Sequence, residues 1–144
     1  MVEQCNADMR FLFEPRSVAM VGASRNPAKF GHVQLRNLVE LGFQGEVYPV
    51  NPNADRLLGL KAYRSVREVP SPIDLAIVTI PASKVPEAIE DCTEKEVKVA
   101  VITSSGFSEV GGEGEERERL IVQTAKKAGM RIVGPNTTGV VNTA

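Results

Sequence analysis

Five short apolar runs, separated by stretches with helical spacing, constrain the fold of this chain more than any other feature. They cover residues 17–21, 45–50, 74–80, 97–103 and 131–133. Runs such as Leu75-Ala76-Ile77-Val78 are apolar without alternation, as expected of strands in a parallel sheet that helices cover on both faces. The sequence therefore predicts an α/β fold with one doubly wound parallel sheet in three layers, α/β/α.

The intervals between these runs predict the helices. Three are expected: one that ends at Gly42, one that Ser83 caps, and one over residues 115–128 that ends at Gly129. The interval 53–69 is shorter and more mixed. It predicts a helical turn at residues 54–58 and a short extended piece near residues 61–63.

Length and charge indicate one domain with a local binding site. The 144 residues suit a single domain, here residues 15–144 after a lead-in of residues 1–14. The 17 Lys and Arg residues nearly balance 18 Asp and Glu, so no broad basic surface for nucleic acid or an anionic membrane is expected. No apolar run approaches the roughly 18 residues of a membrane helix, and no signal-peptide pattern is present, so we expect a cytoplasmic location.

The cysteines and the single histidine offer no catalytic or metal centre. Cys5 and Cys92 lie far apart and form no CxxC pair, so neither a disulfide framework nor a zinc site is expected. Cys92 falls on the apolar stripe of a predicted helix, where packing is its expected role. His32 has no GxSxG-type serine with which to build a hydrolytic triad. We therefore assign no catalytic residue and no metal.

The stretch SVAMVGASRNPAKFG, residues 17–31, is typical of a strand that enters a phosphate-binding loop and then a helix. A helix start presents unpaired N–H groups and a positive dipole end to such a loop. Arg25 and Lys29 flank this helix start and can meet phosphate charge with their own. The loop therefore predicts a phosphorylated ligand, a nucleotide or a relative of one.

Small, polar or proline-containing segments follow each apolar run. They are Gly22-Ala23-Ser24, Asn51-Pro52-Asn53, Pro81-Ala82-Ser83, Ser104-Ser105-Gly106 and Gly134-Pro135-Asn136. In a doubly wound sheet, ligands bind beyond the carboxyl ends of the strands, where the strand order reverses. We therefore expect the binding site at this edge of the sheet.

The same loops disfavour an NAD(P)-binding domain, which is our third hypothesis. The pattern GxGxxG would need glycine where Ser24 stands, and the acidic residue that usually ends the second strand is replaced by Asn51. Asp55 falls past the end of that strand. No GxxxxGK[ST] sequence occurs either, so the chain is not expected to hydrolyse ATP alone.

Six motifs, in order and at matching spacing, resemble the CoA-binding domain of NDP-forming acyl-CoA synthetases. They are SVAMVGASRNPAKFG, VYPVNP, GLKAYRSVREV, IDLAIVTIP, ITSSGF and RIVGPNTTGVVN, and together they span nearly the whole chain. The family includes the ADP-forming acetate-CoA ligases, and the α subunit of succinyl-CoA synthetase is a more distant relative. The resemblance implies a Rossmann-like fold and coenzyme A as the cofactor.

The resemblance also implies a path for CoA along the strand ends. The phosphates would meet the first loop, the pantetheine arm would run past the ends of the third and fourth strands, and the thiol would approach the end of the fifth. The site residues expected are Gly22, Ala23, Ser24, Arg25, Lys29, Val50, Asn51, Pro52, Asn53, Ile80, Pro81, Thr103, Ser104, Ser105, Gly106, Pro135 and Asn136.

Two positions depart from the family pattern. Thr137 stands where many relatives have cysteine after GPN, and Asn53 stands where a lysine often follows VNP. Loss of that lysine removes one positive charge near a ligand phosphate. The change predicts weaker CoA binding with an unchanged fold.

The family reaction converts acyl-CoA, phosphate and NDP into acid, CoA and NTP by way of a phosphorylated histidine. His32 does not match that histidine's segment, and the chain contains no ATP-grasp domain. We therefore expect a CoA-binding domain or subunit that catalyses nothing alone. Its expected partners are CoA or acyl-CoA and other synthetase domains or subunits, and a homo-oligomer is left open. The alternative is a free-standing module that senses CoA or regulates a partner such as an acyltransferase domain.

Overall fold

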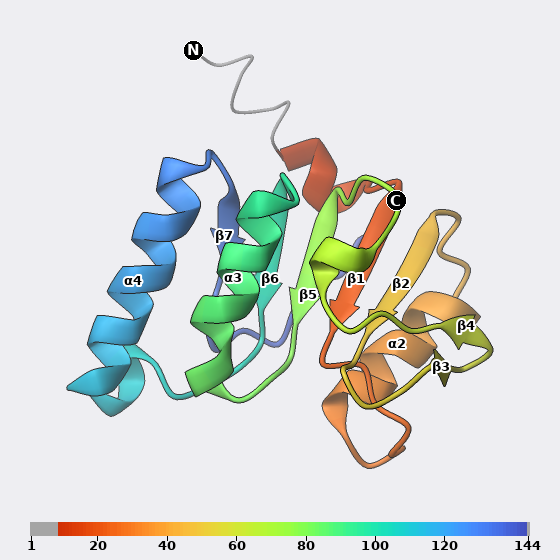
Figure 1. Ribbon diagram of the computed structural model, residues 1–144, viewed down its shortest axis with the longest axis horizontal. Helices are drawn as coiled ribbons and strands as arrows, with labels where there is room; N and C mark the ends of the chain where they lie inside the picture. The colour runs from red at the N-terminus through yellow and green to blue at the C-terminus, as the bar shows by residue number, and fades with distance from the viewer. Residues whose placement is uncertain (1–8, 144) are drawn as a thin grey trace.

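A five-stranded parallel sheet forms the centre of the computed structural model, which describes residues 9–143 (Figure 1). The strands are β1 (Ser17–Val21), β2 (Glu46–Val50), β5 (Leu75–Val78), β6 (Val99–Ile102) and β7 (Arg131–Val133). Their order across the sheet is β2-β1-β5-β6-β7, and every neighbouring pair is parallel. The five predicted strands and the doubly wound parallel sheet are confirmed.

The strand order reverses between β1 and β5. From β1 the chain moves outward to β2, and from β5 it moves the other way to β6 and then β7. Loops at the carboxyl ends of β1 and β5 therefore leave the sheet in opposite directions, which opens a crevice between them. All five arrowheads point to this edge, the lower one in Figure 1.

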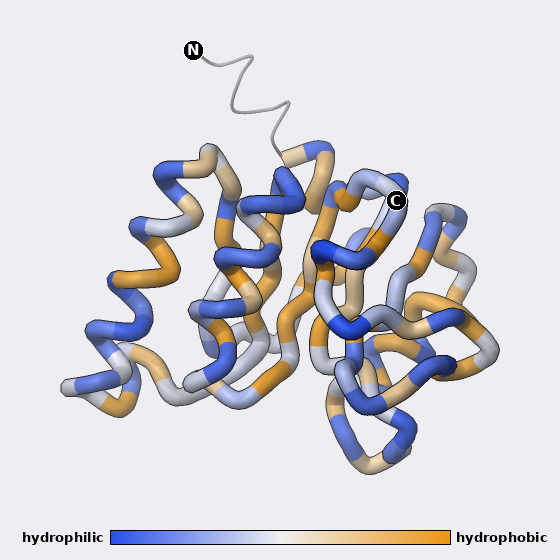
Figure 2. Tube along the Cα trace, in the orientation of Figure 1, coloured by the Kyte–Doolittle hydropathy of each residue, from blue (hydrophilic) through white to orange (hydrophobic). Residues whose placement is uncertain are grey.

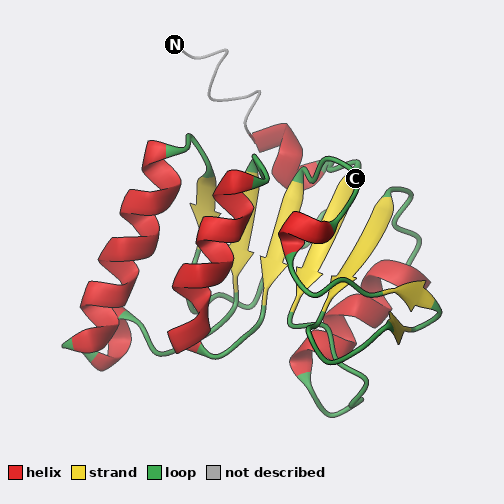
Figure 3. Cartoon of the chain, in the orientation of Figure 1, coloured by secondary structure: helices red, strands yellow, loops and turns green. Residues whose placement is uncertain are grey.

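Helices cover both faces of the sheet, as the unalternating apolar strands predict (Figure 3). On one face lies α2 (Phe30–Glu40), whose Leu35 packs in a buried cluster with Met20. The opposite face is covered by α3 (Val85–Glu94) and α4 (Glu113–Lys127). The apolar colour is concentrated in the strands, whereas the helices alternate between apolar and polar residues (Figure 2).

Part of the segment interpreted as a lead-in packs against the domain. Residues 9–13 are helical, and Leu12 is buried in a cluster with Val18 and Val99 on the face that α2 also covers. The side-chain amide of Asn142 donates a hydrogen bond of 2.6 Å to the carbonyl of Phe13, near the other end of the described chain. Residues 1–8 lie outside the described residues.

The predicted helical turn at residues 54–58 is wrong. The chain instead forms a small antiparallel hairpin from β3 (Arg56–Leu57) and β4 (Leu60–Lys61). Leu58 and Gly59 both have positive φ, 46° and 80°, which makes a tight two-residue hairpin turn. Burial of Leu57, 2% exposed, fixes the hairpin against the domain.

The extended piece predicted near residues 61–63 lies beside the end of β2. Tyr63 forms a parallel bridge with Val50. Its N–H donates to the carbonyl of Pro49 at 2.9 Å, and its carbonyl accepts from the N–H of Asn51 at 2.8 Å. A short 3-10 turn, η1 (Val66–Glu68), then leads toward β5.

The predicted helix stops are confirmed, but the predicted cap of α3 is not. Gly42 and Gly129 follow α2 and α4 with φ of 88° and 71°. Ser83 instead lies within the 3-10 turn η2 (Ala82–Lys84), and α3 begins after Lys84 without a side-chain cap. A backbone hydrogen bond from the N–H of Lys84 to the carbonyl of Pro81 is present before α3, and the side-chain cap expected from Ser83 is not formed.

A polar network joins β1 to β5 at the edge opposite the crevice. One carboxylate oxygen of Asp74, which is 4% exposed, accepts from the backbone N–H and Nε of Arg16 at 2.9 and 3.2 Å. The hydroxyl of Ser17 accepts from the N–H of Asp74 and donates to the carbonyl of Pro72. Specific polar pairs therefore fix the two central strands at this edge.

Neither a membrane-crossing helix nor a metal cluster is present in the described part of the chain. The helix α4 has 15 residues and is strongly charged, and no helix over residues 9–143 is long and apolar enough to span a bilayer. The same residues hold no group of three or more His, Cys, Asp and Glu arranged to bind a metal ion.

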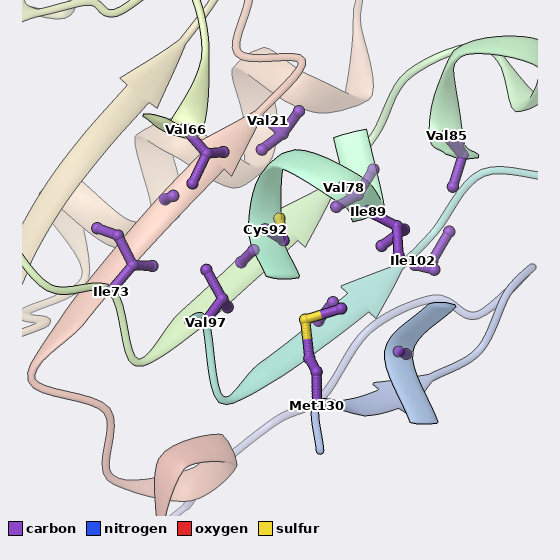
Figure 4. Packing of buried hydrophobic residues seen from close by; sticks show 14 of the residues in the cluster. Val21, Val66, Ile73, Val78, Val85, Ile89, Cys92, Val97, Ile102 and Met130 are labelled. Atoms are coloured by element: carbon purple, nitrogen blue, oxygen red, sulfur yellow. The ribbon is translucent and has the colours of Figure 1, made fainter. Parts of the chain in front are cut away.

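We predict that the thiol of Cys92 is inert in the folded protein. It points from α3 toward the sheet and packs beside Ile89 and Val97 (Figure 4), with none of its surface exposed. This burial raises the pKa of the thiol to about 12, so almost no thiolate forms at pH 8. In a Cys5→Ser background, a thiol reagent should fail to label the native chain and should label it fully in guanidinium. Rapid labelling without denaturant would contradict this packing.

Candidate functional site

A cavity of about 990 Å³ opens at the carboxyl ends of β1 and β5. Its volume is at the upper end of the range for small-molecule sites, roughly 300 to 1,000 Å³. Most of the residues predicted from the sequence lie along its wall. These are Gly22, Ala23, Ser24, Lys29, Val50, Asn51, Pro52, Ile80, Pro81, Thr103, Ser104 and Ser105.

Gly22 forms the turn that leaves β1. Its φ is 93°, and its N–H donates to the carbonyl of Val50 at 3.1 Å. A Cβ at this position would lie 2.0 Å from the carbonyl oxygen of Thr79, on the neighbouring strand end. The turn therefore accepts only glycine, which lets the ends of β1 and β5 approach each other closely at the cavity wall.

Gly31 brings the first turn of α2 against this same loop. A Cβ at Gly31 would lie 2.0 Å from the carbonyl oxygen of Gly22. The carbonyl of Lys29 accepts from the N–H groups of His32 and Val33, which leaves the N–H groups of Phe30 and Gly31 ahead of the first intrahelical acceptor. The positive end of the helix thus faces the loop that leaves β1.

Short side chains hold the loop in shape. The Ser24 hydroxyl accepts from the N–H of Asn26 at 3.1 Å, and the side-chain oxygen of Asn26 accepts from the N–H of Ala28 at 3.0 Å. Nδ1 of His32 lies 2.9 Å from the carbonyl of Ser24, so Nδ1 is the protonated nitrogen. His32, which is 9% exposed, therefore positions the loop.

Asn51 links the end of β2 to the loop after β1. Its side-chain amide donates to the carbonyl of Ala23 at 2.8 Å, and its side-chain oxygen accepts from the N–H of Asn53 at 2.8 Å. Asn51 stands where a dinucleotide-binding domain would carry an acidic residue. Here the amide nitrogen and the side-chain oxygen of Asn51 both form hydrogen bonds with backbone atoms of the site.

Hydroxyl groups form the floor of the cavity between β5 and β6. The hydroxyl of Thr79 donates to the side-chain oxygen of Gln34 at 2.6 Å and lies 2.7 Å from the hydroxyl of Thr103. The Ser104 hydroxyl donates to the carbonyl of Ile80 at 2.5 Å and lies 3.2 Å from its N–H. Through Gln34, the floor is tied to α2 as well.

The loop after β6 is held by charged side chains. The carboxylate of Glu109 accepts from the N–H groups of Gly106 and, at 3.1 Å, Phe107. These hydrogen bonds, first that of Gly106, hold the pKa of Glu109 below its ordinary value. Arg117 donates to the carbonyl of Gly106 at 2.7 Å from the other side.

Five predicted residues lie outside the cavity wall. They are Arg25, Asn53, Gly106, Pro135 and Asn136. The N–H of Asn136 donates to the carbonyl of Ser104 at 2.9 Å, so the segment after β7 borders the wall without entering it. Arg25 is exposed on the loop after β1.

Other lining residues escaped the sequence analysis. They are Val21, Phe30, Gly31, Arg64, Ser65, Val66, Thr79, Lys84, Glu87, Ala88 and Asp91. Gly31 had a usable signal, because a glycine in the first turn of a helix indicates close backbone packing. Residues 64–66 had no such signal. They reach the end of β2 only because the chain forms the β3–β4 hairpin where the sequence predicted a helical turn.

Both acidic and basic side chains line the cavity. Asp91 receives the hydroxyl of Ser65 at 2.9 Å and the guanidinium of Arg67 at 2.7 Å, so its charge is already paired. Arg67 also pairs with Glu94 at 3.1 Å. The side chains of Lys29 and Lys84 have no ion pair within the described residues. Glu87 also lines the wall and has no ion pair among the described residues, so the cations of Lys29, Arg64 and Lys84 outnumber the two carboxylates and leave an excess of positive charge for an anionic ligand.

A family model described as a CoA binding domain matches residues 16–143. The chain belongs to this CoA-binding domain family. Coenzyme A is accordingly the cofactor of the domain, and the NAD(P) hypothesis is set aside. The Rossmann-like fold that the resemblance implied is also confirmed.

Similar proteins are acyl-CoA synthetases. The chain is 54% identical over 136 residues to acetate–CoA ligase [ADP-forming] II of Archaeoglobus fulgidus, covering 94% of this chain and 20% of the relative. It is 47% identical to the α subunit of acetate–CoA ligase [ADP-forming] I of Pyrococcus furiosus, covering 92% and 29%.

A solved structure shares the fold. It is the apo form of a dinucleotide forming acetyl-coenzyme A synthetase 1 of Ca. Korarchaeum cryptofilum, with a TM-score of 0.87 and 48% identity over 91% of this chain and 28% of that one. The chain thus spans less than a third of the length of each of these proteins.

We predict that Gly31→Ala destabilises the fold although alanine is the better helix former. The change should favour a helix by about 1 kcal/mol. The clash with the carbonyl of Gly22 should outweigh this and lower the free energy of unfolding by about 1 to 3 kcal/mol. Urea denaturation measures both variants, with Asn37→Ala on the exposed side of α2 as the control, expected to change little. An equal or higher stability of Gly31→Ala would show that the two backbones do not touch.

Proposed function

We propose that this domain holds CoA for an NDP-forming acyl-CoA synthetase, whose phosphohistidine and nucleotide site belong to other domains or subunits. The observation that carries the proposal is the cavity at the reversal of strand order, whose wall combines the Gly22 turn with the start of α2. Its size, its hydroxyl floor and its positive side chains fit a long ligand with phosphates at one end.

The diphosphate of CoA would lie against the loop after β1. Here Gly22 and Lys29 line the wall, and the N–H groups of Phe30 and Gly31 have no intrahelical acceptor. Backbone N–H groups at a helix start, together with a lysine, are a recurrent phosphate site in proteins. Ser24 can donate its hydroxyl proton there while it still accepts from Asn26.

The pantetheine arm would cross the floor between β5 and β6. Ile80 and Pro81 give that part of the wall apolar surface, and Ser104 and Ser105 give it hydroxyl groups. An arm with amide groups at intervals along an apolar chain needs this combination. The thiol would then approach Pro135 and Asn136, which border the wall beside Ser104.

The chain's own residues would bind and orient CoA while the reaction is completed elsewhere. The synthetase as a whole would interconvert acid, CoA and NTP with acyl-CoA, NDP and phosphate. His32 is committed to the carbonyl of Ser24 and fits a positioning role. The proposed partners are the remaining synthetase domains or subunits, in the cytoplasm, and self-association is compatible with this role.

We expect CoA and acetyl-CoA, but not NAD or NADP, to stabilise the folded chain. A ligand at 100 times its dissociation constant that binds only the folded state adds about 2.7 kcal/mol, a shift of several degrees in Tm. A thermal-shift series with CoA, acetyl-CoA, dephospho-CoA, NAD and NADP makes the comparison. Stabilisation by NAD or NADP alone would overturn the proposal. A CoA response without any synthetase partner in co-purification would favour the free-standing sensor.

We predict that Lys29→Ala weakens CoA and dephospho-CoA by the same factor. Lys29 would meet the diphosphate, which both ligands carry, and a charge-assisted contact of this kind is worth about 10-fold or more in affinity. Isothermal titration gives both dissociation constants, with Lys98→Ala at the opposite edge of the sheet as the control. Unchanged affinities in Lys29→Ala would remove the diphosphate from this loop.

A further inference from the structure

The arginine at position 64 lies on the cavity wall, and its guanidinium is uncommitted. Within the described residues, it forms no hydrogen bond or ion pair, and only the backbone N–H of this residue donates a hydrogen bond, to the carboxylate of Glu68. Nearby Arg67, by contrast, is paired with Asp91 and Glu94. A guanidinium on a cavity wall with no protein partner is free to bind an anionic group of a ligand.

The bridge between Tyr63 and Val50 places this arginine beside the end of β2. Tyr63 exchanges backbone hydrogen bonds with Pro49 and Asn51, and Arg64 is the next residue. In doubly wound domains, the ribose of a nucleotide lies beside the end of the second strand. An acid there binds the 2′-hydroxyl of the NAD ribose, whereas a nearby arginine accommodates the 2′-phosphate of NADP. CoA carries its ribose phosphate on the neighbouring 3′ position.

The end of β2 has no acid and a nearby arginine, as in domains that bind a ribose phosphate. Asn51 replaces the acid and uses its amide group within the protein. Residues 51–54 carry no charge, and Asp55, which follows them, is absent from the cavity wall. On the α3 side of the cavity, the carboxylate of Asp91 is paired with Arg67, whereas that of Glu87 has no ion pair among the described residues. A ribose phosphate would therefore meet the positive charge of Arg64 without an unpaired carboxylate at the strand end.

We propose that Arg64 binds the 3′-phosphate of the CoA ribose and so sets the preference of this domain for CoA over dephospho-CoA. The inference rests on the proposed function, because it presupposes that CoA occupies the cavity. The positive charges of the site would then have two separate roles. Lys29 and the start of α2 bind the diphosphate that many nucleotides share. Arg64 binds the 3′-phosphate, which distinguishes CoA from dephospho-CoA.

The test is the ratio of the dissociation constants for dephospho-CoA and CoA, measured by isothermal titration. In the unmodified chain, the ratio should be about 10 or more, the effect of one charge-assisted contact. Arg64→Ala should bring it close to 1 by weakening CoA alone, and Arg64→Lys should retain part of it. Arg56→Ala, an exposed arginine on β3 outside the cavity wall, is the matched control and should leave the ratio unchanged.

Fragments of the ligand give a second reading that is independent of the pantetheine arm. Adenosine 3′,5′-bisphosphate should compete with CoA better than 5′-AMP does, and Arg64→Ala should remove this advantage. Because the guanidinium forms no hydrogen bond or ion pair within the described residues, the circular dichroism and Tm of Arg64→Ala should match those of the unmodified chain.

The outcomes separate this inference from the proposed function. Binding of CoA with an unchanged ratio in Arg64→Ala overturns the role of Arg64 and leaves the proposed function standing. Equal weakening of both ligands would assign Arg64 to the diphosphate, and a ratio that falls in Lys84→Ala or Arg25→Ala instead would move the 3′-phosphate to that side chain. If neither ligand binds the unmodified chain, both proposals fail together.

Discussion

The contact between two glycines, at the end of β1 and at the start of α2, determines the arrangement of the site. The carbonyl of Gly22 occupies the space where a side chain at position 31 would stand, and the carbonyl of Thr79 occupies the space beside Gly22 itself. Three backbone segments thereby meet with no side chain between them. This close approach lets the helix start, the loop and the end of β5 face one cavity.

Polar side chains stabilise this arrangement from each side of the loop. His32 and Asn51 each hydrogen bond to a backbone carbonyl of the segment 23–24, from α2 and from β2. Gln34, also on α2, accepts a hydrogen bond from the hydroxyl of Thr79 on the cavity floor. A preorganised loop loses less conformational freedom when a ligand binds, so these bonds contribute to affinity without touching the ligand.

The sequence predicts the sheet and the loops because both depend on local signals. Apolar runs without alternation identify the strands, and glycine or proline after each run identifies the strand ends. The path of residues 53–69 could not be predicted in the same way. Positive φ at Leu58, which leucine rarely adopts, and the pairing of Tyr63 with β2 both depend on tertiary contacts. The side chains that only this path brings to the cavity, Arg64 among them, were missed for that reason.

The pairing at the end of β2 also limits how the sheet can grow. β2 is an outer strand, and a strand with unused N–H and C=O groups can recruit another chain. Pro49 has no N–H to donate, and its carbonyl already accepts from Tyr63, which also covers the N–H of Asn51. An approaching strand would find neither donor nor acceptor at this point. The carboxyl half of β2 is thus protected against intermolecular strand addition, and hence against aggregation, by the same residues that carry Arg64 to the cavity.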